Sequence, residues 1–77
     1  MNAIQCKMAR AALGWGTRDL ARNAAVSPDT VARLERGEQL KASTVMALRS
    51  VFEAAGVEFI PANGGGPGVR MMRPLDE

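Results

Sequence analysis

Arg33, Asp29 and Pro28 lie within six residues of one another, and their side chains can distinguish one DNA base pair from another. The guanidinium of Arg33 can donate two hydrogen bonds to a guanine, and the carboxylate of Asp29 can accept one from a cytosine. Asp29 can instead serve only to stabilise the positive end of a helix, so two interpretations of this residue stay open. Pro28 can contact a thymine methyl, but a simple role in starting a helix is the interpretation we favour.

The composition argues against catalysis and against a metal site. The chain has no His and no Tyr, and it offers no pair of nucleophile and base, so we do not expect an enzyme. Cys6 is the single cysteine, so it can form neither an internal disulfide nor a Cys/His metal cluster. We therefore expect no cofactor, and we interpret Cys6 as a small buried hydrophobic residue.

The formal net charge of +2 is unevenly distributed along the chain. Residues 1–41 carry seven Lys or Arg against four acids, whereas residues 42–77 carry three Arg against four acids. A basic half that contains the candidate reading residues is typical of nucleic-acid binding, and an ordinary solvated surface explains the charge equally well. The lone cysteine, with no signal-peptide pattern and no long apolar run, predicts a cytoplasmic protein without membrane contact.

Two helices are predicted before the candidate reading residues. The Ala-rich run 3–13 favours a helix that ends at Gly14. A second helix is predicted over residues 17–24, with Gly16 or Thr17 as its N-cap. Periodicity does not decide which of two apolar stripes is buried on the first helix. These stripes are Cys6, Ala9 and Leu13 on one side, and Ile4, Met8 and Ala11 on the other.

A third helix is predicted over residues 28–36 and carries the candidate reading residues. Ser27 is a good N-cap, and Pro28 suits the first helical position because its missing N–H costs nothing there. Gly37 is expected to stop this helix. Its buried side is marked by Val31 and Leu34.

The chain after Gly37 predicts one more helix and a hairpin. The helix begins at Ser43 or Thr44 and stops at Gly56, and the hydrophobic period then changes to that of two short strands, 57–60 and 69–73. An isolated hairpin is marginal in water, so this one must pack on the helices or on another chain. Residues 74–77 are expected to be a frayed tail. The buried face of the fourth helix is predicted to consist of Val45, Leu48, Phe52 and Ala55.

The second and third helices are separated by three residues, which is the spacing of a helix-turn-helix. Residues 20–37 read LARNAAVSPDTVARLERG and resemble the Cro/CI-type (XRE-like) helix-turn-helix family, whose pattern is L-A-x-x-A-G-V-S-x-x-T-[VI]-x-x-[LI]-E-x-G. The resemblance covers residues 6–56. It implies a mainly α, lambda-repressor-like domain of four helices in residues 1–56, here followed by a short C-terminal β-hairpin in residues 57–73 for packing or dimerisation.

The chain departs from the family pattern at three places. Ala25 stands where relatives have Gly. Relatives have Gly there because the turn is left-handed. The turn therefore either differs in this chain or tolerates a strain of about 1 kcal/mol. Gly16 stands where relatives prefer a capping Ser or Thr. The hairpin replaces the extra helix that many relatives carry at the C-terminus.

The resemblance also implies a role for each candidate residue. Relatives touch base edges from the first turn of the third helix, where this chain has Asp29 and Thr30. Arg10 and Glu35 are expected to form a structural, partly buried ion pair. The candidate base-reading residues are therefore Arg33, Asp29, Thr30 and Pro28. The candidate phosphate-binding residues are Thr17, Arg18, Ser27, Arg36 and Lys41.

Two functions are compatible with these observations. The first is a sequence-specific transcription regulator that binds double-stranded DNA as a homodimer, on a near-palindromic site, with helix 28–36 in the major groove. The second is a protein-binding module, such as an antitoxin or antiactivator, that docks on a partner through the C-terminal strands. Substitution of Arg33 by Ala should abolish the first function and spare the second.

Overall fold

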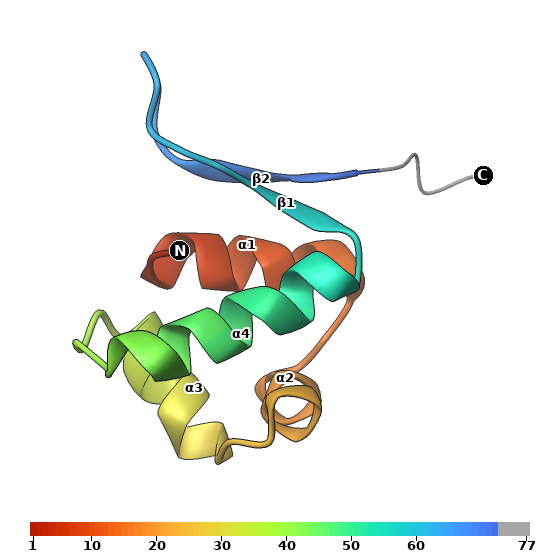
Figure 1. The fold of residues 1–77 in the computed structure, drawn as a ribbon, viewed down its shortest axis with the longest axis vertical. Helices are drawn as coiled ribbons and strands as arrows, with labels where there is room; N and C mark the ends of the chain where they lie inside the picture. Colours follow the sequence, from red (N-terminus) through yellow and green to blue (C-terminus); the bar gives the residue numbers. More distant parts are fainter. Residues whose placement is uncertain (73–77) are drawn as a thin grey trace.

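The computed structural model describes residues 1–72, which form four helices followed by a two-stranded antiparallel sheet (Figure 1). The expected mainly helical architecture with a C-terminal hairpin is therefore confirmed, while Arg73 and the expected tail 74–77 lie outside the described residues. None of the helices within residues 1–72 is long and apolar enough to cross a bilayer. The elements are α1 (Ala3–Leu13), α2 (Thr17–Ala24), α3 (Pro28–Glu35), α4 (Ala42–Ala54), β1 (Val57–Ile60) and β2 (Gly68–Met71).

The hydrophobic core takes two buried residues from each helix and two from β1. Phe52 lies near its centre, with its ring centroid 5.9 Å from that of Trp15 and 6.0 Å from that of Phe59. On α1 the stripe that contains Cys6 is the buried one, whereas Ile4 of the other stripe keeps 52% of its surface exposed. The buried apolar residues are Cys6, Ala9, Leu20, Ala21, Val31, Leu34, Leu48, Phe52, Val57 and Phe59. The outer residues of the predicted α4 face, Val45 and Ala55, are half-buried.

The hairpin lies over α1 and α4, at the end of the molecule opposite α2 and α3 (Figure 1). Val57 pairs with Met71 and Phe59 with Val69, and these four side chains pack against the helices. The buried side chain of Gln5 attaches the hairpin to α1. Its Nε2 donates to the carbonyl oxygens of both strands, at 3.1 Å to Ile60 and 3.0 Å to Gly68.

Three helices end in the same backbone motif, in which a residue in left-handed conformation follows the helix and the next N–H donates to the carbonyl five residues back. Trp15 N donates to Arg10 O at 2.9 Å after α1, and Val26 N donates to Ala21 O at 3.0 Å after α2. The left-handed residue is Gly14 after α1 and Gly37 after α3, but Ala25 after α2. Ala25 has φ 56° and is the single non-glycine residue with positive φ in residues 1–72. The turn therefore keeps the left-handed geometry, and the chain tolerates the strain.

Several boundaries differ from those predicted. The third helix ends at Glu35, because Arg36 is already its C-cap. The fourth helix begins at Ala42 rather than at Ser43 or Thr44, because the carbonyl of Lys41 accepts from the N–H of Thr44 at 3.0 Å and from the next residue at 3.1 Å. The second strand runs from Gly68 to Met71, so it begins one residue earlier than expected and ends before Met72.

Candidate nucleic-acid interface

The helix-turn-helix unit consists of α2, the turn 25–27 and α3. Leu20 of α2 is buried in the same core as Val31 and Leu34 of α3, so the opposite face of α3 is turned to solvent. Pro28 and Asp29 are exposed in the first turn of that helix. The unit therefore presents one side of a short helix, as the sequence predicted.

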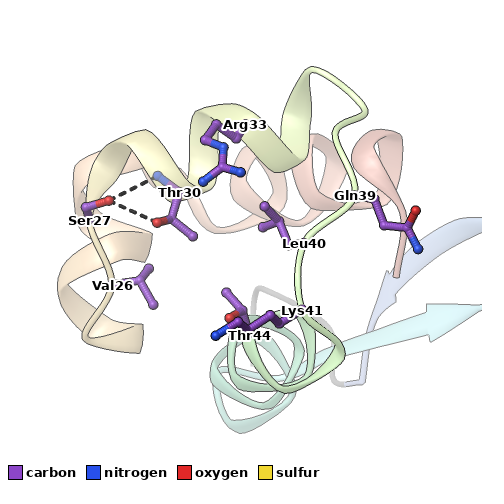
Figure 2. A pocket seen from close by; sticks show the side chains of 8 residues that line it. All are labelled: Val26, Ser27, Thr30, Arg33, Gln39, Leu40, Lys41 and Thr44. Atoms are coloured by element: carbon purple, nitrogen blue, oxygen red, sulfur yellow. Dashed lines mark hydrogen bonds between the residues drawn. The ribbon is translucent and has the colours of Figure 1, made fainter.

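The start of α3 is fixed by a side-chain cap. The Oγ of Ser27 accepts from the N–H of Thr30 at 3.2 Å and lies 2.9 Å from the Oγ1 of Thr30 (Figure 2). Pro28 occupies the first helical position, where no backbone donor is needed. Ser27 and Thr30 are thus held in place by each other, and neither hydroxyl needs a distant partner.

A groove of about 440 Å³ separates α3 from the segment that leads into α4 (Figure 2). Arg33 lines it from the α3 side and Lys41 from the α4 side. The structure therefore brings together four of the predicted site residues, two of them cationic. Sequence reasoning missed Gln39 and Thr44 here, because they follow the helix-turn-helix unit in a stretch with no motif of its own. The lining residues are Val26, Ser27, Thr30, Arg33, Gln39, Leu40, Lys41 and Thr44.

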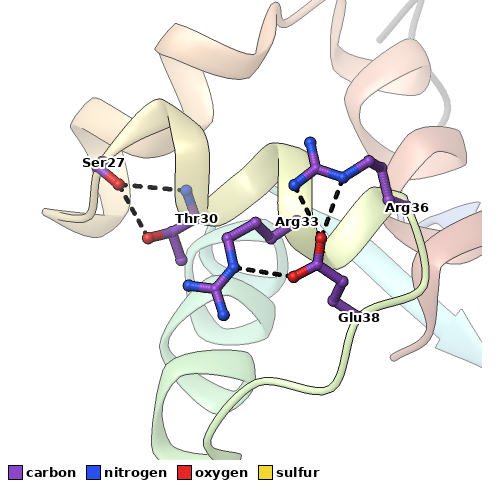
Figure 3. A network of polar contacts seen from close by, with 5 residues as sticks. All are labelled: Ser27, Thr30, Arg33, Arg36 and Glu38. Atoms are coloured by element: carbon purple, nitrogen blue, oxygen red, sulfur yellow. Dashed lines mark hydrogen bonds and ion pairs between the residues drawn. The ribbon is translucent and has the colours of Figure 1, made fainter.

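Glu38 joins Arg33 of α3 to Arg36, the C-cap of that helix (Figure 3). Its Oε1 accepts from Arg33 Nε at 3.1 Å, and its Oε2 accepts from Arg36 Nε at 3.1 Å and from Arg36 Nη2 at 2.8 Å. The hydrogen bonds from Arg36 and then from Arg33 lower the pKa of Glu38. Arg36, which the sequence predicts to bind phosphate, is thus paired with a carboxylate of its own chain.

The position of Glu38 follows from the turn at Gly37, where φ is 90°. This left-handed residue reverses the chain, and the N–H of Glu38 then donates to the carbonyl of Arg33 at 3.0 Å. The sequence signals the turn through its glycine. It contains no signal for the pairing, because the pairing depends on the rotamers of two long side chains.

Arg10 and Glu35 form an ion pair with two short hydrogen bonds. Arg10 Nε lies 2.7 Å from Glu35 Oε2, and Arg10 Nη2 donates to Glu35 Oε1 at 2.8 Å. The remaining Nη1 of Arg10 donates to the carbonyl of Trp15 at 3.1 Å. The two side chains are only 21% and 9% exposed. The pair therefore attaches α1 to the last turn of α3, as expected of a structural contact.

Cys6 forms a cluster with Arg10 and Glu35, because its Sγ donates to Glu35 Oε2 at 3.2 Å. Burial, together with this hydrogen bond and the nearby negative charge, raises the pKa of the Cys6 thiol to about 12. Burial alone would raise the pKa of Glu35 as well, but the hydrogen bonds from Arg10 and Cys6 and the charge of Arg10 outweigh it and lower that pKa. At neutral pH the cluster is therefore a thiol beside a carboxylate and a guanidinium.

Thr17 and Arg18 do not line the groove and lie in the first turn of α2. Gly16 is the N-cap of that helix, so no capping side chain accepts from its first-turn N–H groups. Asp19 instead accepts from the N–H of Gly16 at 2.7 Å and pairs with Arg22 at 2.8 Å. Thr17 is half-buried and Arg18 is exposed, so Arg18 is the more accessible of the two.

The comparisons with known proteins identify no family for this chain. No family model matches it, and no curated protein is significantly similar to it. Residues 1–72 also contain no group of three or more His, Cys, Asp or Glu side chains that could hold a metal ion. The geometry of α3 and of the groove beside it is therefore what indicates a function for this chain.

Proposed function

We propose that this protein is a sequence-specific transcription regulator of the XRE-like helix-turn-helix type, with a lambda-repressor-like fold. One observation supports the proposal above the others. The solvent-facing side of α3 carries Arg33 at the edge of a groove that Lys41 also lines, while the opposite side of the same helix is buried. A single helix that presents an arginine in this way fits the major groove of B-DNA, which is about 12 Å wide.

In this proposal Arg33 is the principal base reader, because arginine can donate two hydrogen bonds to one guanine. Asp29 and Thr30 contact neighbouring base edges, and Pro28 starts the helix or contacts a thymine methyl. Lys41 contacts a phosphate from the far side of the groove. The remaining phosphate contacts come from Thr17, Arg18 and Ser27, whereas Arg36, expected from the sequence to be another, is paired with Glu38.

The protein would act as a homodimer on a near-palindromic site. The described residues measure 32 × 29 × 18 Å, so one copy is about as wide along its two longer axes as one turn of DNA is long. Successive major-groove faces of DNA are about 34 Å apart, which is close to this width. We place this activity in the cytoplasm, where a single unpaired cysteine stays reduced.

The proposal is tested by selection from a random duplex library, followed by fluorescence anisotropy of the selected duplex with the Arg33→Ala variant. We expect a loss of about 1–3 kcal/mol in binding free energy and relaxed preference at one base pair. Arg70→Ala is the matched control. Arg70 is also exposed and paired with a glutamate, at 3.2 Å, but it lies on the hairpin. A library that yields no preferred sequence, with equally weak binding by all three proteins, would contradict the proposal.

The second candidate is docking on a partner protein, as an antitoxin or antiactivator does. It is favoured by the hairpin, which in residues 1–72 has only two strands, so each strand keeps one edge without a strand partner. Such an edge can accept a strand from another chain. A function that depends on this edge alone should be insensitive to Arg33→Ala, which separates the two candidates.

A further inference from the structure

Glu38 binds Arg33 of α3 and the C-cap residue Arg36 in different ways (Figure 3). Arg36 donates hydrogen bonds to Glu38 from both Nε and Nη2, so one whole edge of that guanidinium is occupied. Arg33 donates a hydrogen bond to Glu38 from Nε alone. Within residues 1–72, the terminal Nη1 and Nη2 groups of Arg33 donate to no protein atom. The same carboxylate therefore engages the fork of Arg36 and leaves the end of the Arg33 fork available.

The free end of Arg33 is the part that suits a guanine. Two parallel N–H donors match the O6 and N7 acceptors on its major-groove edge. A flexible arginine loses rotamer freedom when it binds, and fixing its Nε beforehand reduces that cost. A carboxylate on Nε can thus orient the side chain without covering its reading end.

The carboxylate of Glu38 also weakens contacts with the phosphate backbone of DNA, which carry no sequence information. Phosphate binding depends on cations that are free to neutralise the backbone. Glu38 forms an ion pair with Arg36, and the negative charge of Glu38 repels phosphate. Its side chain is 44% exposed, so bound DNA could approach it.

We propose that Glu38 is a specificity-determining residue, which positions Arg33 for a guanine and suppresses sequence-independent binding by Arg36. This inference rests on the proposed DNA-binding function. Specificity is the ratio of the two affinities, so lowering the non-specific affinity raises specificity even where the specific affinity is unchanged.

The backbone of the turn does not require this carboxylate. The turn after α3 is held by the backbone N–H of Glu38, which any residue but proline supplies. The variants Glu38→Gln and Glu38→Ala should therefore fold as the wild type does, which circular dichroism can verify. Gln keeps an oxygen that can accept from Arg33 Nε but removes the charge, whereas Ala removes both.

Glu58→Gln is the matched control for the change in charge. Glu58 pairs with Arg70 on the outer face of the hairpin, and its side chain is 46% exposed. The hairpin lies at the end of the molecule opposite α3 (Figure 1). An effect of net charge alone would be the same in Glu58→Gln as in Glu38→Gln.

The experiment measures binding by fluorescence anisotropy at several salt concentrations with three duplexes. The first is the selected site, the second is that site with the guanine read by Arg33 replaced, and the third is a random sequence. We expect both Glu38 variants to bind the random duplex roughly tenfold more tightly than the wild type, since a like charge beside phosphate is removed. The plot of log affinity against log salt should steepen by about 0.9, the value for one additional phosphate contact. Glu38→Ala should lose more of the preference for guanine than Glu38→Gln.

The outcomes separate this inference from the function on which it rests. If the wild type prefers its selected site and Glu38→Gln behaves as Glu58→Gln does, the inference is overturned and the DNA-binding proposal stands. Equal weakening of binding to all three duplexes by the Glu38 variants would also overturn it, because Glu38 would then support binding as such. If the wild type prefers no duplex, both proposals fall together.

Discussion

Ala25 shows at the scale of one residue how the fold imposes an unfavourable conformation. Its φ of 56° and ψ of 42° lie in the left-handed region, where a Cβ costs roughly 1–2 kcal/mol. The turn needs this geometry because Val26 must follow at once and pack against the core. The equivalent residues after α1 and α3 are Gly14 and Gly37, which carry no such cost.

Ala25→Gly should therefore stabilise the protein. Relief of the left-handed strain is partly offset by the greater freedom of glycine in the unfolded chain, so the net gain in unfolding free energy should be about 0.5–1 kcal/mol. Urea unfolding followed by circular dichroism measures this change. Ala11→Gly serves as the control, because Ala11 is exposed inside α1 and the same substitution there should cost about 1 kcal/mol. A loss of stability in Ala25→Gly would refute the strain argument.

Arg10→Ala should be destabilising before it affects any binding preference. It would leave the carboxylate of Glu35, which is 9% exposed, without its partner, and the thiol of Cys6 would be the remaining donor to it. Because the pair is partly rather than fully buried, we expect a loss of about 2–3 kcal/mol. Thermal unfolding is the measurement, with Arg70→Ala as an exposed-pair control that should cost under about 1 kcal/mol. An unchanged melting temperature in Arg10→Ala would contradict the structural role.

Gln5 matters at the scale of elements, because it joins α1 to both strands of the hairpin. Its side chain is 6% exposed, and its Nε2 is shared between the carbonyls of Ile60 and Gly68. Its Oε1 accepts from the N–H of Asn2 at 3.0 Å, so both ends of the amide are satisfied. A two-stranded sheet is marginal by itself, and this contact adds to the packing of Phe59 and Val57.

Gln5→Ala should loosen the hairpin more than the helices. Losing the donor leaves two carbonyls and one N–H without this partner, which should cost about 1–3 kcal/mol. Amide hydrogen exchange in β1 and β2 should accelerate, while amides of α3 should change only as much as global stability does. Gln39→Ala, at an exposed position, is the control. Uniform acceleration over the whole chain would show that the hairpin is not a separate unit.

At the scale of the whole molecule, stability should fall in acid. The pKa of Glu35 is lowered in the folded state, and so are those of Asp19 and Glu38. A carboxyl group with a lowered pKa stabilises the fold above its unfolded pKa, about 4 for these groups, and loses that contribution as pH falls through the folded pKa. The melting temperature should therefore decrease as pH falls below about 4, as these groups take up protons. The decrease should be smaller in Arg10→Ala, because Glu35 is then no longer held ionised by its partner. An identical acid dependence in both proteins would argue against this pair as a source of it.

Sequence reasoning succeeded where local chemistry decides the outcome. Ser27 followed by Pro28 predicts a helix start, and Gly14 and Gly37 predict helix ends, because caps and left-handed residues act within a few positions of themselves. The buried stripe of α1 could not be chosen in this way, since α3, β2 and the ion pair of Arg10 select it from outside the helix.

The unpredicted parts of the site and the fold depend on distant or flexible partners. Gln5 is a polar residue in an apolar helix, and only the docked hairpin makes it a buried contact. Glu38 lies in a polar connection, and its role depends on how two arginine side chains turn. The base-reading and phosphate-binding roles stay predictions, since they depend on DNA that would have to be present to test them.

The contact between Gln5 and the hairpin also bears on the order in which the chain folds. It joins residues that are 55 and 63 positions apart, whereas α2 and α3 contact each other across a three-residue turn. Closing a long loop costs entropy before its contacts form, so local pairs assemble earlier than distant ones. We therefore expect the hairpin to dock last, and we expect Gln5 to affect the rate of unfolding more than the rate of folding. The helix-turn-helix unit could then be assembled while the hairpin is still undocked.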